Sequence, residues 1–352
     1  MRAWEKNIRR VDPYVPGEQP SGEKLIKLNT NENPYPPAPG VERALREMDY
    51  GRLRKYPDPA ASVLTGCLAG YYGVGEDQVF VGVGSDDVLA MAFLAFFNSP
   101  KPILFPDVSY SFYKVWANLF GIPYEMPALD QEFRICPPDY YKENGGVVFP
   151  NPNAPTGLLL GLGEVEDIIR HNQDVVVVVD EAYIDFGGRS ALALLNRYEN
   201  LLVVQTFSKA RSMAGLRIGF AIGNPRLIRA LNDVKYSYNS YTMNMPSLVL
   251  GVESVKEERY FRDTVAKIVK TREQAKKRLC ALGFTFPDSM SNFIFARHEK
   301  AAAPKLFEAL KSRQIYVRYF AQPRLENYLR ITVGTDEEME ELYHFLEGYL
   351  AY

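Results

Sequence analysis

Short, wholly apolar runs alternate with helix-like stretches between residues 79 and 236. The runs lie at 79–83, 103–105, 147–149, 175–179, 201–204 and 218–222. Because they are continuously apolar, they are typical of strands that helices cover on both faces. The stretches between them predict helices at 88–97, 111–120, 164–172 and 225–236. The pattern therefore predicts an α/β fold in which a buried sheet lies between two helical layers.

The two ends of the chain follow a different pattern. The sequence up to about Pro39 is rich in Pro, Asn and Gly, which predicts an irregular arm, and a helical pattern runs from Pro59 to Tyr72. A long helix is predicted at about 257–282. Candidate strands follow near 293–296, 316–318 and 329–333, and an amphipathic helix begins at Asp336. We therefore expect a large α/β domain at 30–250 and a smaller α+β domain that combines 1–29 with 251–352.

Composition narrows the chemistry that the chain can perform. The 41 basic and 43 acidic residues give a net charge of −2, which favours neither a nucleic-acid nor a membrane-surface partner. The three Cys and three His are scattered, so the sequence predicts no metal site and no disulfide framework. The longest apolar run, 88–97, is much shorter than the ~20 residues that cross a bilayer. The N-terminus lacks the apolar core of a secretion signal, so we expect a cytoplasmic location.

Polar residues follow several predicted strands, which is where an open α/β sheet places its ligand crevice. Gly84, Ser85 and Asp86 stand between the first strand and a helix. The free N–H groups of a helix N-terminus suit a phosphate, but the motif by itself is more typical of a helix cap. The Pro-rich segment 150–157 is either a rigid loop at a site or an ordinary connection.

Three charged residues also stand at strand ends. Asp180 follows the 175–179 run, where a carboxylate is costly without a cation, although a cap or a salt bridge would also explain it. Lys209 comes shortly after the 201–204 run, where burial favours a neutral or covalently engaged amine, although a lone loop lysine is usually at the surface. Arg217 begins the next strand, and its guanidinium can clamp a phosphate with two hydrogen bonds.

Together these residues match the needs of pyridoxal phosphate, which are an amine for a Schiff base, a carboxylate for the ring nitrogen and donors for the phosphate. The chain resembles the fold-type I, class-II pyridoxal-phosphate-dependent aminotransferases, and within them the histidinol-phosphate aminotransferases. The segments that carry the resemblance are LNTNENPYPP at 28–37, RKYPDP at 54–59, GVGSDD at 82–87, SYSFY at 109–113, NPNAPTG at 151–157, DEAYIDF at 180–186, TFSKARSMAGLRIGF at 206–220 and YLRITVGT at 328–335. The resemblance implies a mostly parallel seven-stranded sheet.

The resemblance also implies a role for each site residue. Lys209 would hold the cofactor and move the proton, Asp180 would pair with the ring nitrogen, and Tyr183 would contact the ring 3-hydroxyl. Tyr110 would stack on the ring. The other cofactor contacts would come from Gly84, Ser85, Asp86, Asn153, Thr206, Ser208, Arg217 and Tyr56 of the partner subunit.

The reaction implied is amino-group transfer between L-histidinol phosphate and 2-oxoglutarate, in a homodimer with shared active sites. Arg330 would bind the carboxylate of the amino acceptor and also serve the phosphate-bearing substrate, with Arg318, Tyr14 and Asn33 as further substrate contacts. An aromatic amino acid aminotransferase and a threonine-phosphate decarboxylase have similar motifs and stay open as alternatives. A non-enzymatic regulator would need a DNA-binding helix-turn-helix, and a dinucleotide-binding dehydrogenase would need GxGxxG; the sequence has neither.

One position departs from the family pattern. Ala154 stands where the family usually has an asparagine that contacts the ring 3-hydroxyl, and Asn153 is one step earlier. Either Asn153 substitutes through a shifted backbone, or Tyr183 holds the ring oxygen with less help, at a cost of ~1–3 kcal/mol.

Overall fold

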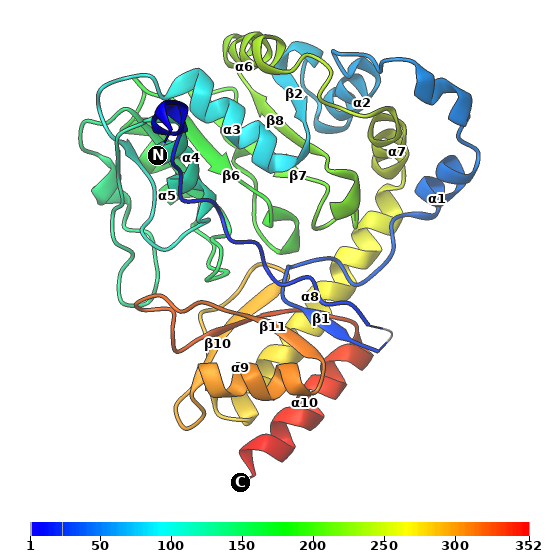
Figure 1. Cartoon of the computed structure of the whole chain (residues 1–352), viewed down its shortest axis with the longest axis vertical. Coiled ribbons are helices and arrows are strands. Elements are labelled where there is room, and N and C mark those ends of the chain that lie inside the picture. The colour runs from blue at the N-terminus through cyan, green and yellow to red at the C-terminus, as the bar shows by residue number, and fades with distance from the viewer. Residues whose placement is uncertain (1, 23, 352) are drawn as a thin grey trace.

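The computed structural model describes residues 2–22 and 24–351, which form two sheets joined by a long helix (Figure 1). Within these residues, seven strands make the larger sheet in the order β2-β8-β7-β6-β5-β3-β4. Their bounds are β2 Val79–Gly82, β3 Ile103–Leu104, β4 Tyr124–Glu125, β5 Gly146–Pro150, β6 Val177–Asp180, β7 Leu201–Thr206 and β8 Gly219–Gly223. Of these seven strands only β8 runs opposite to the other six, so the predicted mostly parallel sheet is confirmed.

Helices cover both faces of this sheet, which explains why its strands are continuously apolar. Val178 of β6 packs on one face with α3 and α4, whereas its neighbours Val177 and Val179 pack on the other face with α5. Successive residues of a strand point to opposite faces, so both must be apolar when both faces are covered. The helices of this part are α1 Pro39–Arg46, α2 Ser62–Tyr72, α3 Gly84–Phe96, α4 Phe112–Phe120, α5 Leu162–Arg170, α6 Pro225–Tyr238 and α7 Met245–Lys256.

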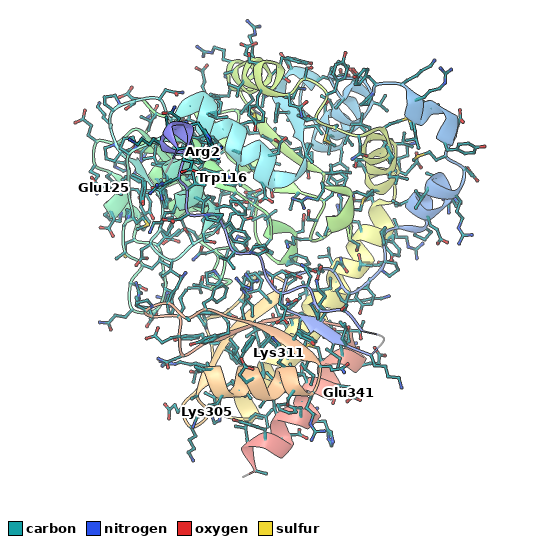
Figure 2. All side chains as sticks on the ribbon, in the orientation of Figure 1. Arg2, Trp116, Glu125, Lys305, Lys311 and Glu341 are labelled. Atoms are coloured by element: carbon teal, nitrogen blue, oxygen red, sulfur yellow. The ribbon has the colours of Figure 1, made fainter. Side chains whose placement is uncertain are left out.

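The smaller sheet has the order β1-β11-β12-β10-β9 and packs against α9, α10 and the end of α8. Its strands are β1 Ile26–Leu28, β9 Phe284–Thr285, β10 Phe293–His298, β11 Ile315–Tyr319 and β12 Leu329–Thr332, and its helices are α9 Ala303–Ser312 and α10 Asp336–Leu350. In α9, Leu306 and Leu310 are buried against the sheet, whereas Lys305 is exposed (Figure 2). This amphipathic arrangement produces a helix with one apolar face.

The structure corrects the prediction of an irregular arm up to Pro39. Residues Ile26–Leu28 form β1, which pairs in parallel with β11 near the other end of the chain. A strand of three residues shows no alternation that a sequence pattern could reveal, and its partner is remote in sequence. The short strands β4 and β9 and the helices α1, α7 and α9 were also missed. The division into domains at 30–250 and at 1–29 with 251–352 stays a prediction.

Helix α8, Glu258–Ala281, confirms the predicted long helix and leads from the larger sheet to the smaller one (Figure 1). No helix in the described ranges is long and apolar enough to cross a membrane.

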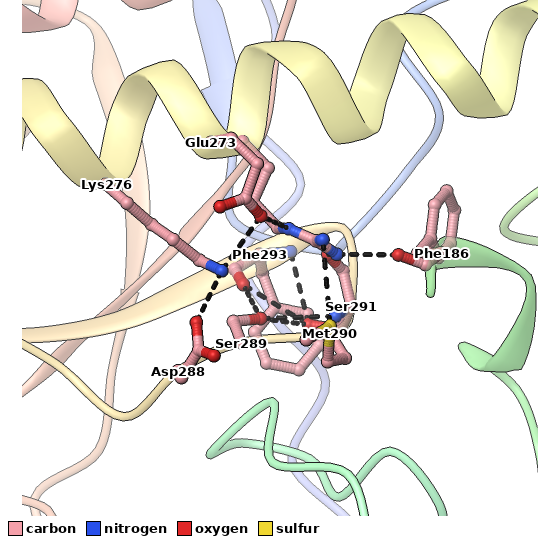
Figure 3. Close-up of polar contacts among 9 residues, drawn as sticks. Phe186, Glu273, Lys276, Asp288, Ser289, Met290, Ser291 and Phe293 are labelled. Carbon is pink, nitrogen blue, oxygen red and sulfur yellow. Dashed lines mark hydrogen bonds and ion pairs between the residues drawn. The ribbon is translucent and has the colours of Figure 1, made fainter. Parts of the chain in front are cut away.

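The side chain of Arg272 is buried, and its Nη1 donates to the backbone oxygens of Phe186 at 2.8 Å and Ser291 at 3.0 Å. Next to it, Lys276 donates to Asp288 at 2.7 Å (Figure 3). Through Arg272 and Lys276, hydrogen bonds and an ion pair connect α8 to the turn after β6 and to the loop before β10.

We predict that Arg272→Met lowers the free energy of unfolding by about 2–5 kcal/mol, because two buried backbone oxygens lose their donor. Denaturant unfolding followed by circular dichroism measures this loss. Arg259→Met is the matched control, since Arg259 lies on the same helix with a side chain that is 97% exposed; its effect should stay within about 0.5 kcal/mol. Equal losses for the two variants would contradict the role of the buried guanidinium.

Candidate active site

A cavity of about 550 Å³ lies where β5, β6 and β7 end, as expected for the ligand crevice of an open α/β sheet. Nine of the predicted cofactor residues line it: Ser85, Asp86, Tyr110, Asp180, Tyr183, Thr206, Ser208, Lys209 and Arg217. These residues come from four separate sequence motifs. The tertiary structure therefore brings together an amine, a buried carboxylate and a set of anion donors.

Asp180 is the last residue of β6 and is 4% exposed. Its side chain accepts hydrogen bonds from the hydroxyl of Tyr113 at 2.7 Å and from the backbone N–H of Ala182 at 3.2 Å. Burial raises the pKa of Asp180 to about 6, although both hydrogen bonds act in the opposite direction. No cation in residues 2–22 and 24–351 forms a salt bridge with this carboxylate. A protonated ring nitrogen of a ligand would supply the missing positive charge.

The start of α3 and the side chain of Arg217 form one end of the cavity. Gly84 begins α3 with φ +82°, and a Cβ built on Gly219 would lie 2.2 Å from the carbonyl carbon of Gly84. Only glycine at 219 therefore lets β8 approach the helix start so closely. Arg217 donates to Asp86 at 3.0 Å, and the Tyr110 hydroxyl donates to the same carboxylate at 2.7 Å. The N–H groups of α3 and the Arg217 guanidinium together suit a phosphate.

Lys209 lies just after β7, and its Nζ donates to the backbone oxygen of Thr30 at 3.0 Å. This Nζ also lies 5.8 Å from the centre of the Tyr183 ring. No carboxylate within the described part of the chain forms a salt bridge with Lys209. The Lys209 side chain therefore lines the cavity while its amine is held by a backbone oxygen.

The segment 29–33, which follows β1, contacts several site residues. The backbone oxygen of Asn29 accepts from Arg330 at 3.0 Å, and the side chain of Asn31 donates to the Tyr183 hydroxyl at 2.9 Å. In this segment the sequence predicts a role only for Asn33. The Asn33 side chain bonds the backbone of Ala210 and of Tyr35, and its substrate contact stays a prediction. Asn31 and Tyr113 were missed, although both lie inside motifs that carried the resemblance.

Arg318 and Arg330 face each other across neighbouring strands. They are direct partners in the antiparallel register of β11 and β12, so their side chains leave the sheet on the same face. Burial lowers the pKa of the Arg330 guanidinium, and its buried Nε has no hydrogen-bond partner among the described residues. Two like charges side by side are unfavourable unless an anion lies against them, so this pair suits an anionic substrate group. Tyr14 stacks on Phe112 with ring centres 4.2 Å apart.

Three predicted cofactor residues do not line the cavity. Gly84 lies behind Arg217 at the helix start. Asn153 is buried, and its amide donates to Val108 at 3.0 Å, whereas Ala154 lines the cavity in its place. Tyr56 is 82% exposed and lines a separate surface groove of about 680 Å³. The cofactor contacts of these three residues stay predictions.

The donor set fits a phosphorylated pyridine cofactor. Among the described residues no cation forms a salt bridge with the buried carboxylate of Asp180, and Lys209, the start of α3 and Arg217 line the same cavity. Asp180 suits the ring nitrogen of pyridoxal phosphate, Lys209 suits its aldehyde, and the start of α3 with Arg217 suits its phosphate. The arrangement therefore agrees with the chemistry that the sequence led us to expect.

Comparison with known proteins gives consistent matches over almost the whole chain. The family model described as aminotransferase class I and II matches residues 23–346. The chain is 49% identical over 348 residues to a histidinol-phosphate aminotransferase of Lactococcus lactis subsp. cremoris, covering 99% of this chain and 98% of that protein. It is 51% identical over 348 residues to histidinol-phosphate aminotransferase 1 of Methylococcus capsulatus, again covering 99% and 98%.

A solved structure shares the fold. The histidinol-phosphate aminotransferase of Sinorhizobium meliloti, crystallised with pyridoxal-5'-phosphate, superposes with a TM-score of 0.85 at 23% identity, covering 93% of this chain and 92% of that one. At this identity the likeness shows the fold alone. The family model covers most of the chain, and the two relatives are about half identical to it over nearly their full length. The chain therefore belongs to the aminotransferase class I and II family.

Proposed function

We propose that this aminotransferase moves an amino group between L-histidinol phosphate and 2-oxoglutarate with pyridoxal phosphate as its cofactor. The observation that supports the proposal most is the cavity that unites Lys209, the buried carboxylate of Asp180 and the anion donors around Arg217. Relatives that carry the name histidinol-phosphate aminotransferase, at 49% and 51% identity over nearly the full length, support the substrate.

Each of the proposed cofactor residues would contact a different part of pyridoxal phosphate. Pyridoxal phosphate, when bound, supplies an aldehyde that takes up the amino group and a ring that spreads negative charge. Lys209 would hold it through Nζ and, once the amine of the substrate has taken its place, the freed Nζ would move a proton at the substrate carbon, because Lys209 is the lysine that lines the cavity. Asp180 would hold a proton on the ring nitrogen through a buried ion pair. Arg217 and the start of α3 would hold the phosphate.

Both substrates carry an anionic group that Arg330 would bind. The amino acceptor presents a carboxylate, whereas histidinol phosphate presents a phosphate at the other end of a short chain. Arg318, which faces Arg330 across the strands, supplies the second positive charge that a phosphate needs. Tyr14 and Asn33 are the further substrate contacts that we propose.

We also propose that the chain forms a homodimer in which Tyr56 of the partner subunit completes the cofactor site. Two further exposed apolar side chains lie beside this residue: Val63 lines the same groove, and the ring of Tyr241 lies 4.6 Å from the Tyr56 ring between centres. Exposed apolar side chains that gather in one region favour an interface, since burying them removes apolar surface from water. Within its own subunit Tyr56 lines a groove apart from the cavity, as a residue donated to a neighbour would. A cytoplasmic location stays a prediction from the sequence.

A half-reaction test distinguishes the substrates. The purified protein loaded with pyridoxal phosphate is mixed in turn with histidinol phosphate, phenylalanine and threonine phosphate. We expect histidinol phosphate to convert the cofactor to its pyridoxamine form fastest, as followed by absorbance, without release of CO₂. Lys209→Ala is the control and should neither convert the cofactor nor retain it after borohydride treatment. Faster conversion by phenylalanine, or CO₂ from threonine phosphate, would favour one of the two alternatives.

Asp180→Asn should lower kcat by ~10²- to 10³-fold, because a neutral amide cannot form the buried ion pair with the ring nitrogen, which is worth roughly 3–4 kcal/mol. Steady-state kinetics measures the loss, and equilibrium titration with pyridoxal phosphate should show that binding is partly kept through the phosphate donors. A kcat within about threefold of the wild type would refute the proposed role of Asp180.

Arg330→Ala should raise KM for 2-oxoglutarate by about tenfold or more, because the carboxylate loses its charged donor. Arg318→Ala should raise KM for histidinol phosphate by a larger factor than KM for 2-oxoglutarate. Initial-rate kinetics with each substrate varied in turn measures both. An unchanged KM for 2-oxoglutarate in Arg330→Ala would contradict the carboxylate contact.

A further inference from the structure

Asn31 contacts the cavity residue Tyr183 but has no part in the function proposed above. It is 1% exposed, and its Nδ2 donates to the hydroxyl oxygen of Tyr183 at 2.9 Å. The backbone of Asn31 has φ +56°, a left-handed conformation that asparagine adopts more readily than most residues. A strained, buried residue of this kind points to a specific requirement for its side chain.

Hydrogen bonds on three sides fix the direction in which the Asn31 amide points. The hydroxyl of Thr332 accepts from the backbone N–H of Asn31 at 3.0 Å and donates to its Oδ1 at 3.1 Å. The side chain of Asn292 donates to the backbone oxygen of Asn31 at 3.0 Å. Because the Thr332 proton goes to Oδ1, the NH₂ group of Asn31 is the one that faces Tyr183.

This arrangement determines what the Tyr183 hydroxyl can do. A phenol has one proton and accepts through its oxygen. Since the oxygen already accepts from Asn31, the proton of Tyr183 stays available for an acceptor in the cavity that this residue lines. The ring 3-oxygen of pyridoxal phosphate is such an acceptor. The neighbouring Ala154 also lines the cavity, but its methyl group cannot donate a hydrogen bond.

We propose that Asn31 is a positioning residue for the cofactor, which holds the Tyr183 hydroxyl so that its proton points to the ring 3-oxygen. The side chain of Asn153 is committed to Val108 and Thr156, so it does not supply this donor. The chain thus relies on Tyr183 as the donor, and Asn31 orients it. This inference rests on the proposed binding of pyridoxal phosphate.

Asn31→Asp tests the proposal because it preserves size and reverses the hydrogen bond. A carboxylate can only accept, so it would take the Tyr183 proton away from the cavity. A donor on the ring 3-oxygen draws negative charge away from the nearby nitrogen that Lys209 supplies, so its loss should raise the pKa of that nitrogen. We expect the pH midpoint of the visible absorbance change of the holoenzyme to rise by about one unit, equivalent to about 1.4 kcal/mol.

The same substitution in a Tyr183→Phe background separates the hydrogen bond from the added charge. If Asn31 acts through the hydroxyl, Asn31→Asp should no longer move the midpoint when the hydroxyl is absent. A negative charge acting directly would raise the midpoint equally in both backgrounds. Asn31→Gly is a second variant that accepts the positive φ without strain; it should raise the midpoint by less than Asn31→Asp, and only when Tyr183 is present.

An unchanged midpoint in Asn31→Asp and Asn31→Gly, or an equal rise in the Tyr183→Phe background, would overturn the proposal. Thermal unfolding of each holoenzyme checks that the variants are folded, and Asn31→Gly carries the test if Asn31→Asp is not. The titration of the wild-type protein distinguishes a failure of the proposed function from a failure of the proposed role of Asn31. A wild-type chain that shows no visible band with pyridoxal phosphate would refute the proposed function, whereas unaltered variants beside a normal wild type would refute only the role of Asn31.

Discussion

The carboxylate of Asp180 imposes the constraint on which the rest of the site depends. It ends a strand whose neighbours on both sides are also buried strands, so the charge is removed from water. Two hydrogen bonds, from Tyr113 and from the backbone of Ala182, offset only part of that cost, as the raised pKa of the group shows. A fold that keeps an acid here needs a cationic partner, and the open side of the carboxylate faces the cavity. The position of this one charge therefore favours a ligand with a protonated nitrogen.

The cavity is completed by a segment from the other end of the fold. Segment 29–33 follows β1, which belongs to the smaller sheet, yet its residues contact Lys209 and Tyr183 beside the larger sheet. Arg330 of β12 bonds the same segment through the backbone oxygen of Asn29. The substrate end and the cofactor end of the site are thus linked by one short stretch of backbone. Helix α8 also links the two parts, because its Arg272 bonds both the turn after β6 and the loop before β10.

The strands of the larger sheet were predictable because each is buried on both faces and reads as a continuous apolar run. The bounds of one of these strands differ from the prediction: the apolar run at 175–179 corresponds to a strand at Val177–Asp180. Asp180 is therefore the last residue of the strand and does not follow it. The two-residue strand β4 escaped prediction because it carries too few residues to show a period. Helix α9 has ten residues and an amphipathic pattern, so its length does not explain why it was missed. Nine of the predicted cofactor residues line one cavity, because strand-end positions and the family motifs pointed to the same side chains; their contacts with the cofactor stay predictions.

The sequence by itself determined the kind of chemistry. A lysine and an aspartate stand at the carboxyl ends of predicted strands, and parallel strands must bring these ends to one edge. Arg217 precedes its strand and reaches the same edge because β8 runs antiparallel, which only the structure shows. Only the tertiary structure decided that Arg318 and Arg330 are cross-strand partners, that Asn153 turns away while Ala154 faces the cavity, and that Asn31 reaches Tyr183. These facts depend on strand register and on pairing between residues far apart in sequence. Local periodicity contains no information about either, because register is set by the packing of whole elements.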